Sequence, residues 1–186
     1  MAKKTITISG LPGSGTTTVA KILAEKLEMK YVNMGEIFRE MAEEMKMKLE
    51  SFEKYCEEHP EIDSEIDRRQ EEIMKKGNVI VEGRLSGWIA HLKKLRAFKI
   101  WLDCDEKERT RRIVEREGGE IFERKAEMKE REESEERRYR KFYGINIHDK
   151  SIYDLVIDTT SIPPEKVVEQ ILEKIRERRE MNPYFK

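Results

Sequence analysis

The chain has 186 residues, a length that suits one domain with room for small mobile insertions. Its 38 Lys and Arg nearly balance its 39 Asp and Glu, so no overall field would draw it to nucleic acid or to a membrane surface. Charged residues make up 41% of the chain, against roughly 25% in an average soluble domain, and this enrichment is typical of hyperthermophile proteins.

Cysteine usage and the N-terminus indicate the cellular compartment. Cys56 and Cys104 lie far apart and have no metal-ligand spacing, so we expect free thiols in a reducing cytosol. The apolar run behind the basic Met1–Lys4 is too short for a signal peptide or a membrane span. We therefore expect a cytoplasmic monomer without membrane or nucleic-acid partners.

Five short apolar runs predict buried strands, and long helical segments separate them. The runs are 5–9, 31–33, 78–82, 98–103 and 155–158. This β-α alternation predicts a single α/β domain with a mainly parallel sheet covered on both faces. Ligands of such sheets bind beyond the carboxyl ends of the strands, so the residues that follow each strand are the candidates for function.

The first strand is followed by a glycine loop with phosphate-binding spacing. The pattern is G-x-x-x-x-G-K-[ST], and this loop fits it except that Thr16 replaces the lysine. An amphipathic helix follows, so backbone N–H groups and a helix N-terminus would surround an anion. We expect the loop to bind a phosphate group and Thr17 to ligate Mg²⁺ directly. The loop residues are Gly10, Leu11, Pro12, Gly13, Ser14, Gly15, Thr16, Thr17 and Thr18.

Polar groups also follow the next three strands. They occur in the segments 33–39, 82–84 and 103–105. Glu82 ends a buried strand, where we expect it to hold a water molecule of the metal ion. The alternative for Glu82 is a helix cap or an ion-pair partner for Arg84.

Two segments, about 41–76 and 105–143, have too little apolar content to contribute to a core. Solvated helices with i,i+4 ion pairs explain most of their charges. In the second segment, Asp105 and Glu108 suit a capping pair, and three arginines recur at helical spacing behind them. The last helix carries an apolar stripe and begins near Pro163 and Pro164, so its role is packing.

The order of these motifs resembles the nucleoside monophosphate kinases. More narrowly, the chain is similar to the cytidylate (CMP) kinases in their archaeal form, in which Gly-Thr-Thr-Thr replaces Gly-Lys-Thr. The resemblance covers the chain up to about residue 179. It rests on the glycine loop, Met-Gly-Glu-Ile-Phe-Arg at 34–39, Glu-Gly-Arg at 82–84, the arginine-dense 105–116 and Tyr-Asp-Leu-Val-Ile-Asp-Thr at 153–159.

This resemblance implies a three-layer P-loop kinase fold with a five-stranded, mainly parallel sheet. It also implies an acceptor-binding segment at about 40–76 and a lid with a charged helix at about 105–147. The implied reaction transfers the γ-phosphoryl group of ATP, with Mg²⁺, to CMP and to dCMP.

The resemblance also implies roles for arginines. Arg39 and Arg84 would grip the CMP phosphate. A later array of Arg131, Glu135 and Arg138 would reach the acceptor nucleotide, with Glu in place of the bacterial Asp. A further arginine of the bacterial family aligns with Asp63, unless Arg68 takes its place.

The lid would supply the cations that the loop lacks. Arg112 and Arg116 would meet the transferring phosphoryl group when the lid closes, and Arg109 would pack on the adenine. Two alternatives stay open. One is another small-acceptor kinase of this fold, of the adenylate or shikimate type, and the other is a nucleotide-binding regulator without turnover.

Overall fold

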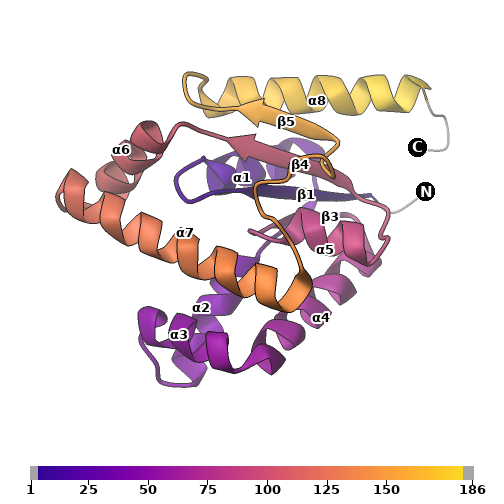
Figure 1. The fold of residues 1–186 in the computed structure, drawn as a ribbon. Coiled ribbons are helices and arrows are strands. Elements are labelled where there is room, and N and C mark those ends of the chain that lie inside the picture. The colour runs from indigo at the N-terminus through magenta and orange to yellow at the C-terminus, as the bar shows by residue number, and fades with distance from the viewer. Residues whose placement is uncertain (1–3, 182–186) are drawn as a thin grey trace.

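Five strands form one sheet in the computed structural model, which describes residues 4–181 (Figure 1). They are β1 (Thr5–Gly10), β2 (Lys30–Asn33), β3 (Val79–Glu82), β4 (Phe98–Asp103) and β5 (Leu155–Asp158). Their order across the sheet is β2–β3–β1–β4–β5, and every adjacent pair is parallel. The five predicted strands are confirmed to within one residue at each end, and the sheet is wholly rather than mainly parallel.

Eight helices connect these strands in the described part of the chain. They are α1 (Thr16–Leu27), α2 (Met34–Glu44), α3 (Leu49–Glu58), α4 (Pro60–Lys76), α5 (Ser86–Leu92), α6 (Glu106–Glu117), α7 (Ile121–Tyr143) and α8 (Pro164–Met181). None of the helices in this part is long and apolar enough to cross a membrane.

Helices cover both faces of the sheet, which gives the three predicted layers (Figure 1). Successive residues of a strand point to opposite faces, and β3 shows the result. Ile80 joins a core with Leu23 of α1 and Ile171 of α8, and all three are 0% exposed. Its neighbours Val79 and Val81 pack on the opposite face, in a core that includes residues of α4 and α5. The predicted packing role of the last helix is confirmed.

The segment 41–76 contributes a small core of its own, so the prediction that it is too polar for this was wrong. Phe52 and Cys56 of α3 are both 0% exposed and pack with Ala42 of α2. The ring of Phe38 lies 4.8 Å from that of Phe52. These few apolar residues come from different helices and converge only in the fold, which a residue count along the segment cannot show. Burial raises the pKa of the Cys56 thiol to about 12.

The segment 105–143 forms a helical hairpin of α6 and α7, joined at Gly118 and Gly119. Its apolar residues are few, yet Met128 and Tyr139 are buried, so the same correction applies here. Asp105 caps α6 by accepting from the Lys107 backbone N–H. The expected second half of the capping pair is absent, because Glu108 pairs with arginines of its own helix instead.

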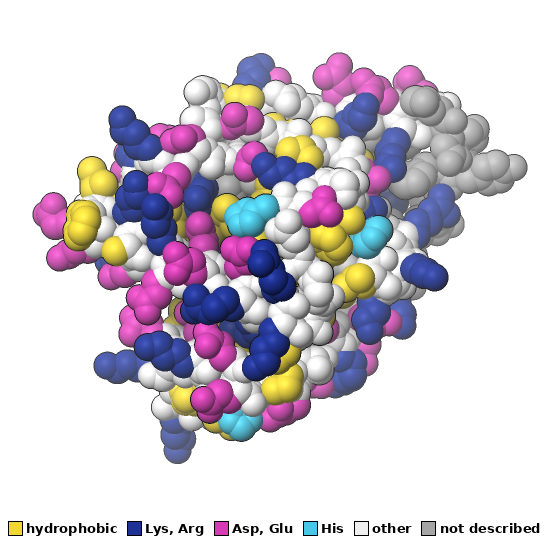
Figure 2. Space-filling model, in the orientation of Figure 1, with side chains coloured by type: hydrophobic (Ala, Val, Ile, Leu, Met, Phe, Trp, Pro, Cys, Tyr) yellow, Lys and Arg dark blue, Asp and Glu magenta, His cyan; other side chains and the backbone are white. Residues whose placement is uncertain are grey.

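Charges of both signs are interspersed over the visible face of the molecule (Figure 2). This distribution agrees with the net charge of −1. Many of the pairs join exposed residues three or four apart on one helix, as expected for solvated helices. Such pairs contribute only ~0.3–0.5 kcal/mol each to stability.

Candidate functional site

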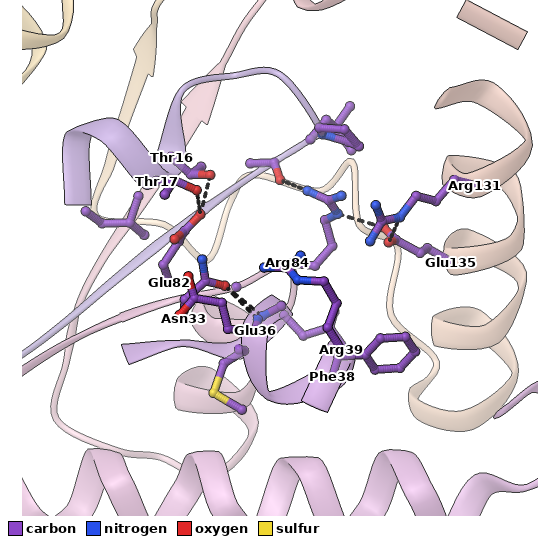
Figure 3. A pocket seen from close by; sticks show the side chains of 18 of the residues that line it. Thr16, Thr17, Asn33, Glu36, Phe38, Arg39, Glu82, Arg84, Arg131 and Glu135 are labelled. Atoms are coloured by element: carbon purple, nitrogen blue, oxygen red, sulfur yellow. Dashed lines mark hydrogen bonds and ion pairs between the residues drawn. The ribbon is translucent and has the colours of Figure 1, made fainter. Parts of the chain in front are cut away.

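A cleft of about 550 Å³ lies where the carboxyl ends of β1 and β3 meet helices α2, α4, α6 and α7. We call it the main cleft. Residues of the glycine loop, Glu82 and five arginines line it, so segments that are far apart in the sequence share one cavity (Figure 3). The arginines are Arg39, Arg84, Arg116, Arg131 and Arg138.

The glycine loop has the backbone geometry of an anion site. Gly13 has a φ of +81°, and a Cβ there would lie 2.6 Å from the backbone oxygen of Arg109. Gly15 is the N-cap of α1, with a φ of +87°, no side-chain cap and no acidic residue in the first turn. The first N–H groups of a helix have no partner within the helix. The start of α1 therefore fits a phosphate group.

Glu82 accepts hydrogen bonds from three hydroxyl groups, and Figure 3 shows the two that come from Thr16 and Thr17. Thr16 and Thr17 donate to its Oε1 atom at 2.7 Å and 2.8 Å. The Tyr31 hydroxyl donates to Oε2 at 2.5 Å, and burial together with this bond raises the pKa of Tyr31. The hydroxyl at the lysine position of the loop thus contacts the acidic group that ends β3.

Arg84 does not pair with Glu82, which was one alternative for that carboxylate. Its Nε atom lies 2.6 Å from Glu135 of α7, and its Nη1 atom donates to the Gly10 carbonyl at 2.6 Å. Burial alone would raise the pKa of Glu135, but the charges of Arg84 and Arg131 outweigh it and hold that pKa below its ordinary value. Glu135 is therefore an anion that positions cations at the cleft.

The other arginines of the main cleft differ in how firmly they are held. Arg131 contacts Glu135 and Glu53 at 3.1 Å and 3.2 Å. Arg138 pairs with Asp63 at 3.2 Å, and its buried Nη1 atom has no hydrogen-bond partner among the described residues. Arg39 is exposed and makes no hydrogen bond or ion pair with any described residue. Among the described residues, Arg116 pairs only with the adjacent Glu117.

Arg109, which we expected to pack on the adenine, is buried inside the protein. Its side chain is buried, donates to the Pro12 carbonyl at 3.1 Å and pairs with Glu132 of α7. It lines neither the main cleft nor the second cavity described below. Arg109 therefore supports the glycine loop from behind and ties it to the α6–α7 hairpin.

Arg112 lines a second cavity, of about 420 Å³, which Ser14 and Gly15 of the loop also line. We call it the rear cavity. The Arg112 guanidinium donates to the Thr159 carbonyl at 2.6 Å and lies 3.5 Å from the Gly13 carbonyl. The cavity continues along the segment 159–164, which joins β5 to α8. Arg112 and Arg116, predicted together at the phosphoryl group, therefore line different cavities.

Arg68 does not replace the missing bacterial arginine. It is exposed on α4, pairs with Glu65 and Glu72, and does not line the main cleft. Asp63 does line the cleft. Asp63, the other candidate for that position, is a buried carboxylate next to Arg138.

The sequence did not single out several residues of α4 and α7 that line the main cleft. They are Ile66, Asp67, Gln70 and Tyr139. One available signal was the spacing of polar residues on α4. Asp63, Asp67 and Gln70 lie on one helix face, which turns inward although its residues are polar.

A phosphate-binding loop between the first strand and first helix of a parallel sheet, facing a cleft lined with arginines, defines the P-loop kinase class of phosphotransferases. Solved structures support the fold. A shikimate kinase from Bacteroides thetaiotaomicron superposes with a TM-score of 0.62 at 16% identity, over 94% of this chain and 99% of that one. A shikimate kinase from Acinetobacter baumannii gives 0.61 at 14% identity, over 96% of both chains.

Within that class, residues 5–161 match the model of the cytidylate kinase-like family, and the chain belongs to this family. Curated relatives named cytidylate kinase support this. One from Pyrococcus horikoshii is 51% identical over 165 residues, which are 89% of this chain and 84% of the relative. One from Archaeoglobus fulgidus is 50% identical over 171 residues, or 91% and 93% of the two chains.

Proposed function

We propose that this protein is a CMP kinase, which transfers the γ-phosphoryl group of ATP to CMP and also to dCMP. The observation that carries the proposal is the convergence of five arginines on the cleft in front of the glycine loop. ATP carries a triphosphate and CMP a monophosphate, and the planar guanidinium group of arginine binds phosphate groups through two N–H donors at once. A binding protein without turnover would have little use for so many cations around one cavity.

The two cavities suggest how the substrates are arranged. They share Thr18 and are otherwise lined by different residues of the loop. We place the acceptor CMP in the main cleft, with its phosphate near Arg39, Arg84 and Arg131. We place the adenine of ATP in the rear cavity, where it would pack on Arg112 rather than on Arg109. The ATP phosphates then lie along the loop. This arrangement brings the reacting phosphates together without a covalent intermediate.

Magnesium would be held by oxygen ligands at the start of α1. The Thr17 hydroxyl and the Glu82 carboxylate fit a hard cation. No cluster of three or more metal-ligating side chains exists among the described residues. This fits Mg²⁺, which keeps several waters and takes other oxygens from substrate phosphates. When bound, the ion would neutralise charge on the transferring group, while Glu82 orients Thr17 and a water molecule. A monomeric state and a cytoplasmic location stay predictions.

An acceptor panel tests this function. The purified protein is assayed for ADP release with ATP, Mg²⁺ and one acceptor at a time: CMP, dCMP, UMP, AMP or shikimate. We expect kcat/KM for CMP to exceed the values for AMP and shikimate by roughly 10²-fold or more, because unmatched polar groups in a built site reject the wrong acceptor. A better turnover of AMP or shikimate would contradict the proposal. ATP binding without turnover of any acceptor would instead identify a nucleotide-binding regulator.

A further inference from the structure

One face of α4 presents an unusual set of residues to the main cleft. Asp63, Ile66, Asp67 and Gln70 are spaced i, i+3, i+4 and i+7, and all four line the cavity. Such a stripe is normally apolar in a helix that packs inward. Asp63 is only 7% exposed and Gln70 only 3%. Burying polar side chains costs free energy unless each is hydrogen-bonded, so the partners of Asp63, Asp67 and Gln70 decide what this helix face does.

Two of the polar side chains, Asp63 and Gln70, have partners within the protein. The Asp63 carboxylate lies 3.2 Å from Arg138 Nε, and this ion pair balances its charge. The Oε1 atom of Gln70 accepts from the Ser86 hydroxyl at 2.8 Å. This bond fixes which end of the Gln70 amide is the acceptor. The Nε2 donor then makes no hydrogen bond with any described residue.

Asp67 has no cation close enough to form an ion pair within the described residues. The groups that face it are the hydroxyl of Tyr143 on α7, the carboxylate of Asp63 on its own helix and the ammonium of Lys93 behind α5. Burial outweighs the Tyr143 hydrogen bond and raises the pKa of Asp67 to about 6. Asp67 is therefore mainly a carboxylate at pH 7, with acceptor capacity to spare.

Apolar and aromatic side chains complete this end of the cavity. They are Met34, Phe38, Ile66, Leu85 and Tyr139. A planar base suits such walls, because its faces bury apolar surface while its edge keeps hydrogen bonds. The cavity therefore offers one negatively charged acceptor and one amide donor, one helical turn apart, between apolar walls.

We propose that Asp67 and Gln70 read the edge of the cytosine base, with Asp67 accepting from the 4-amino group and Gln70 Nε2 donating to N3. This inference rests on the proposed function and adds the residues that set acceptor specificity. Uracil carries a carbonyl oxygen in place of the 4-amino group and an N–H in place of the bare N3. It would place acceptor against acceptor at Asp67 and donor against donor at Gln70, so the same two residues reject UMP.

The substitution Asp67→Asn tests this assignment. Asparagine keeps the size of the side chain, loses the charge and can turn its amide to donate to O4 of uracil. We expect kcat/KM for CMP to fall roughly 10–100-fold, as for the loss of a hydrogen bond to a charged group. Because UMP gains a partner, the CMP-to-UMP ratio of kcat/KM should fall further. Glu72→Gln, an exposed change on the outer face of α4, is the matched control and should leave the ratio unchanged.

The pH dependence of the CMP-to-UMP ratio distinguishes base recognition by Asp67 from a merely structural role, which would leave this ratio independent of pH. Below a pH of about 6 the Asp67 carboxyl becomes protonated and can donate to O4 of uracil. The CMP-to-UMP ratio of the wild-type protein should therefore decline as the pH falls through about 6 and should be flat for Asp67→Asn. Ionisation of the acceptor phosphate is common to both nucleotides and cancels in the ratio.

The outcomes separate this inference from the proposed function. A collapsed ratio in Asp67→Asn, with an unchanged thermal midpoint, supports the assignment. Equal losses on CMP and UMP, or an unchanged ratio, overturn it while leaving CMP kinase activity in place. A wild-type protein that phosphorylates neither nucleotide overturns the proposed function and this inference together.

Discussion

Replacing Arg116 with alanine should lower kcat roughly 10³-fold while changing KM for ATP and CMP far less, if this residue acts as an arginine finger. Arg116 is the arginine of α6 that lines the main cleft, and its only partner in the part of the chain that the structure describes is the adjacent Glu117. It is therefore held loosely before the substrates bind. A cation that meets the phosphoryl group only when the hairpin closes stabilises the transition state more than the bound substrates, and so acts on kcat.

Single-turnover measurement of phosphoryl transfer, with ATP and CMP bound beforehand, isolates this effect from substrate binding and product release. Lys107→Ala is the control, because Lys107 is exposed on the same helix and lines neither cavity. A rise in KM for Arg116→Ala with an unchanged transfer rate would assign Arg116 to substrate binding and contradict the finger role.

Replacing Arg84 with methionine should weaken both acceptor use and stability. The substitution leaves Glu135 buried without its closest cation, a loss that typically costs ~3–5 kcal/mol. It also removes the contact with the Gly10 carbonyl at the start of the glycine loop. We expect kcat/KM for CMP to fall by roughly 10²–10³-fold, because Arg84 would also bind the CMP phosphate. Each 1.4 kcal/mol of binding free energy that is lost corresponds to a factor of ten.

The two consequences of Arg84→Met are measured separately. Chemical denaturation reports the loss in free energy of unfolding, and KM for CMP is measured at a temperature where the variant stays folded. Arg137→Met is the matched control, because Arg137 is exposed on α7 and does not line the cleft. A destabilised variant with an unaltered KM for CMP would show that Arg84 only supports the fold.

The glycine loop and the sheet could be predicted because their signals are local. Gly10 and Gly15 have a fixed spacing, and each strand is a short apolar run between polar segments. Parallel pairing then places every strand end at one edge, so Glu82 and Arg84 could be assigned to the site from the sequence. In the structure both residues line the main cleft.

The partners of the charged residues could not be predicted. Arginines at 109, 112 and 116 share a helical spacing, yet Arg109 is buried against Pro12, Arg112 faces the rear cavity and Arg116 faces the main cleft. A turn of 3.6 residues makes these positions drift around the helix, and only packing decides which cavity each one meets. The face of α4 that we propose reads the base could not be predicted for a related reason, because polar residues in a helix are typical of a solvent-exposed surface.

We infer that Arg116 supplies the cation that is missing at Thr16. Both residues line the main cleft, so a lysine at position 16 would place its ammonium in the cavity that Arg116 reaches. The most direct test compares single-turnover phosphoryl transfer in Thr16→Lys, Arg116→Ala and the double variant. We predict that lysine restores at least ~10-fold of the rate lost in Arg116→Ala and adds little when Arg116 is present. A double variant that binds both nucleotides and is no faster than Arg116→Ala would contradict the claim.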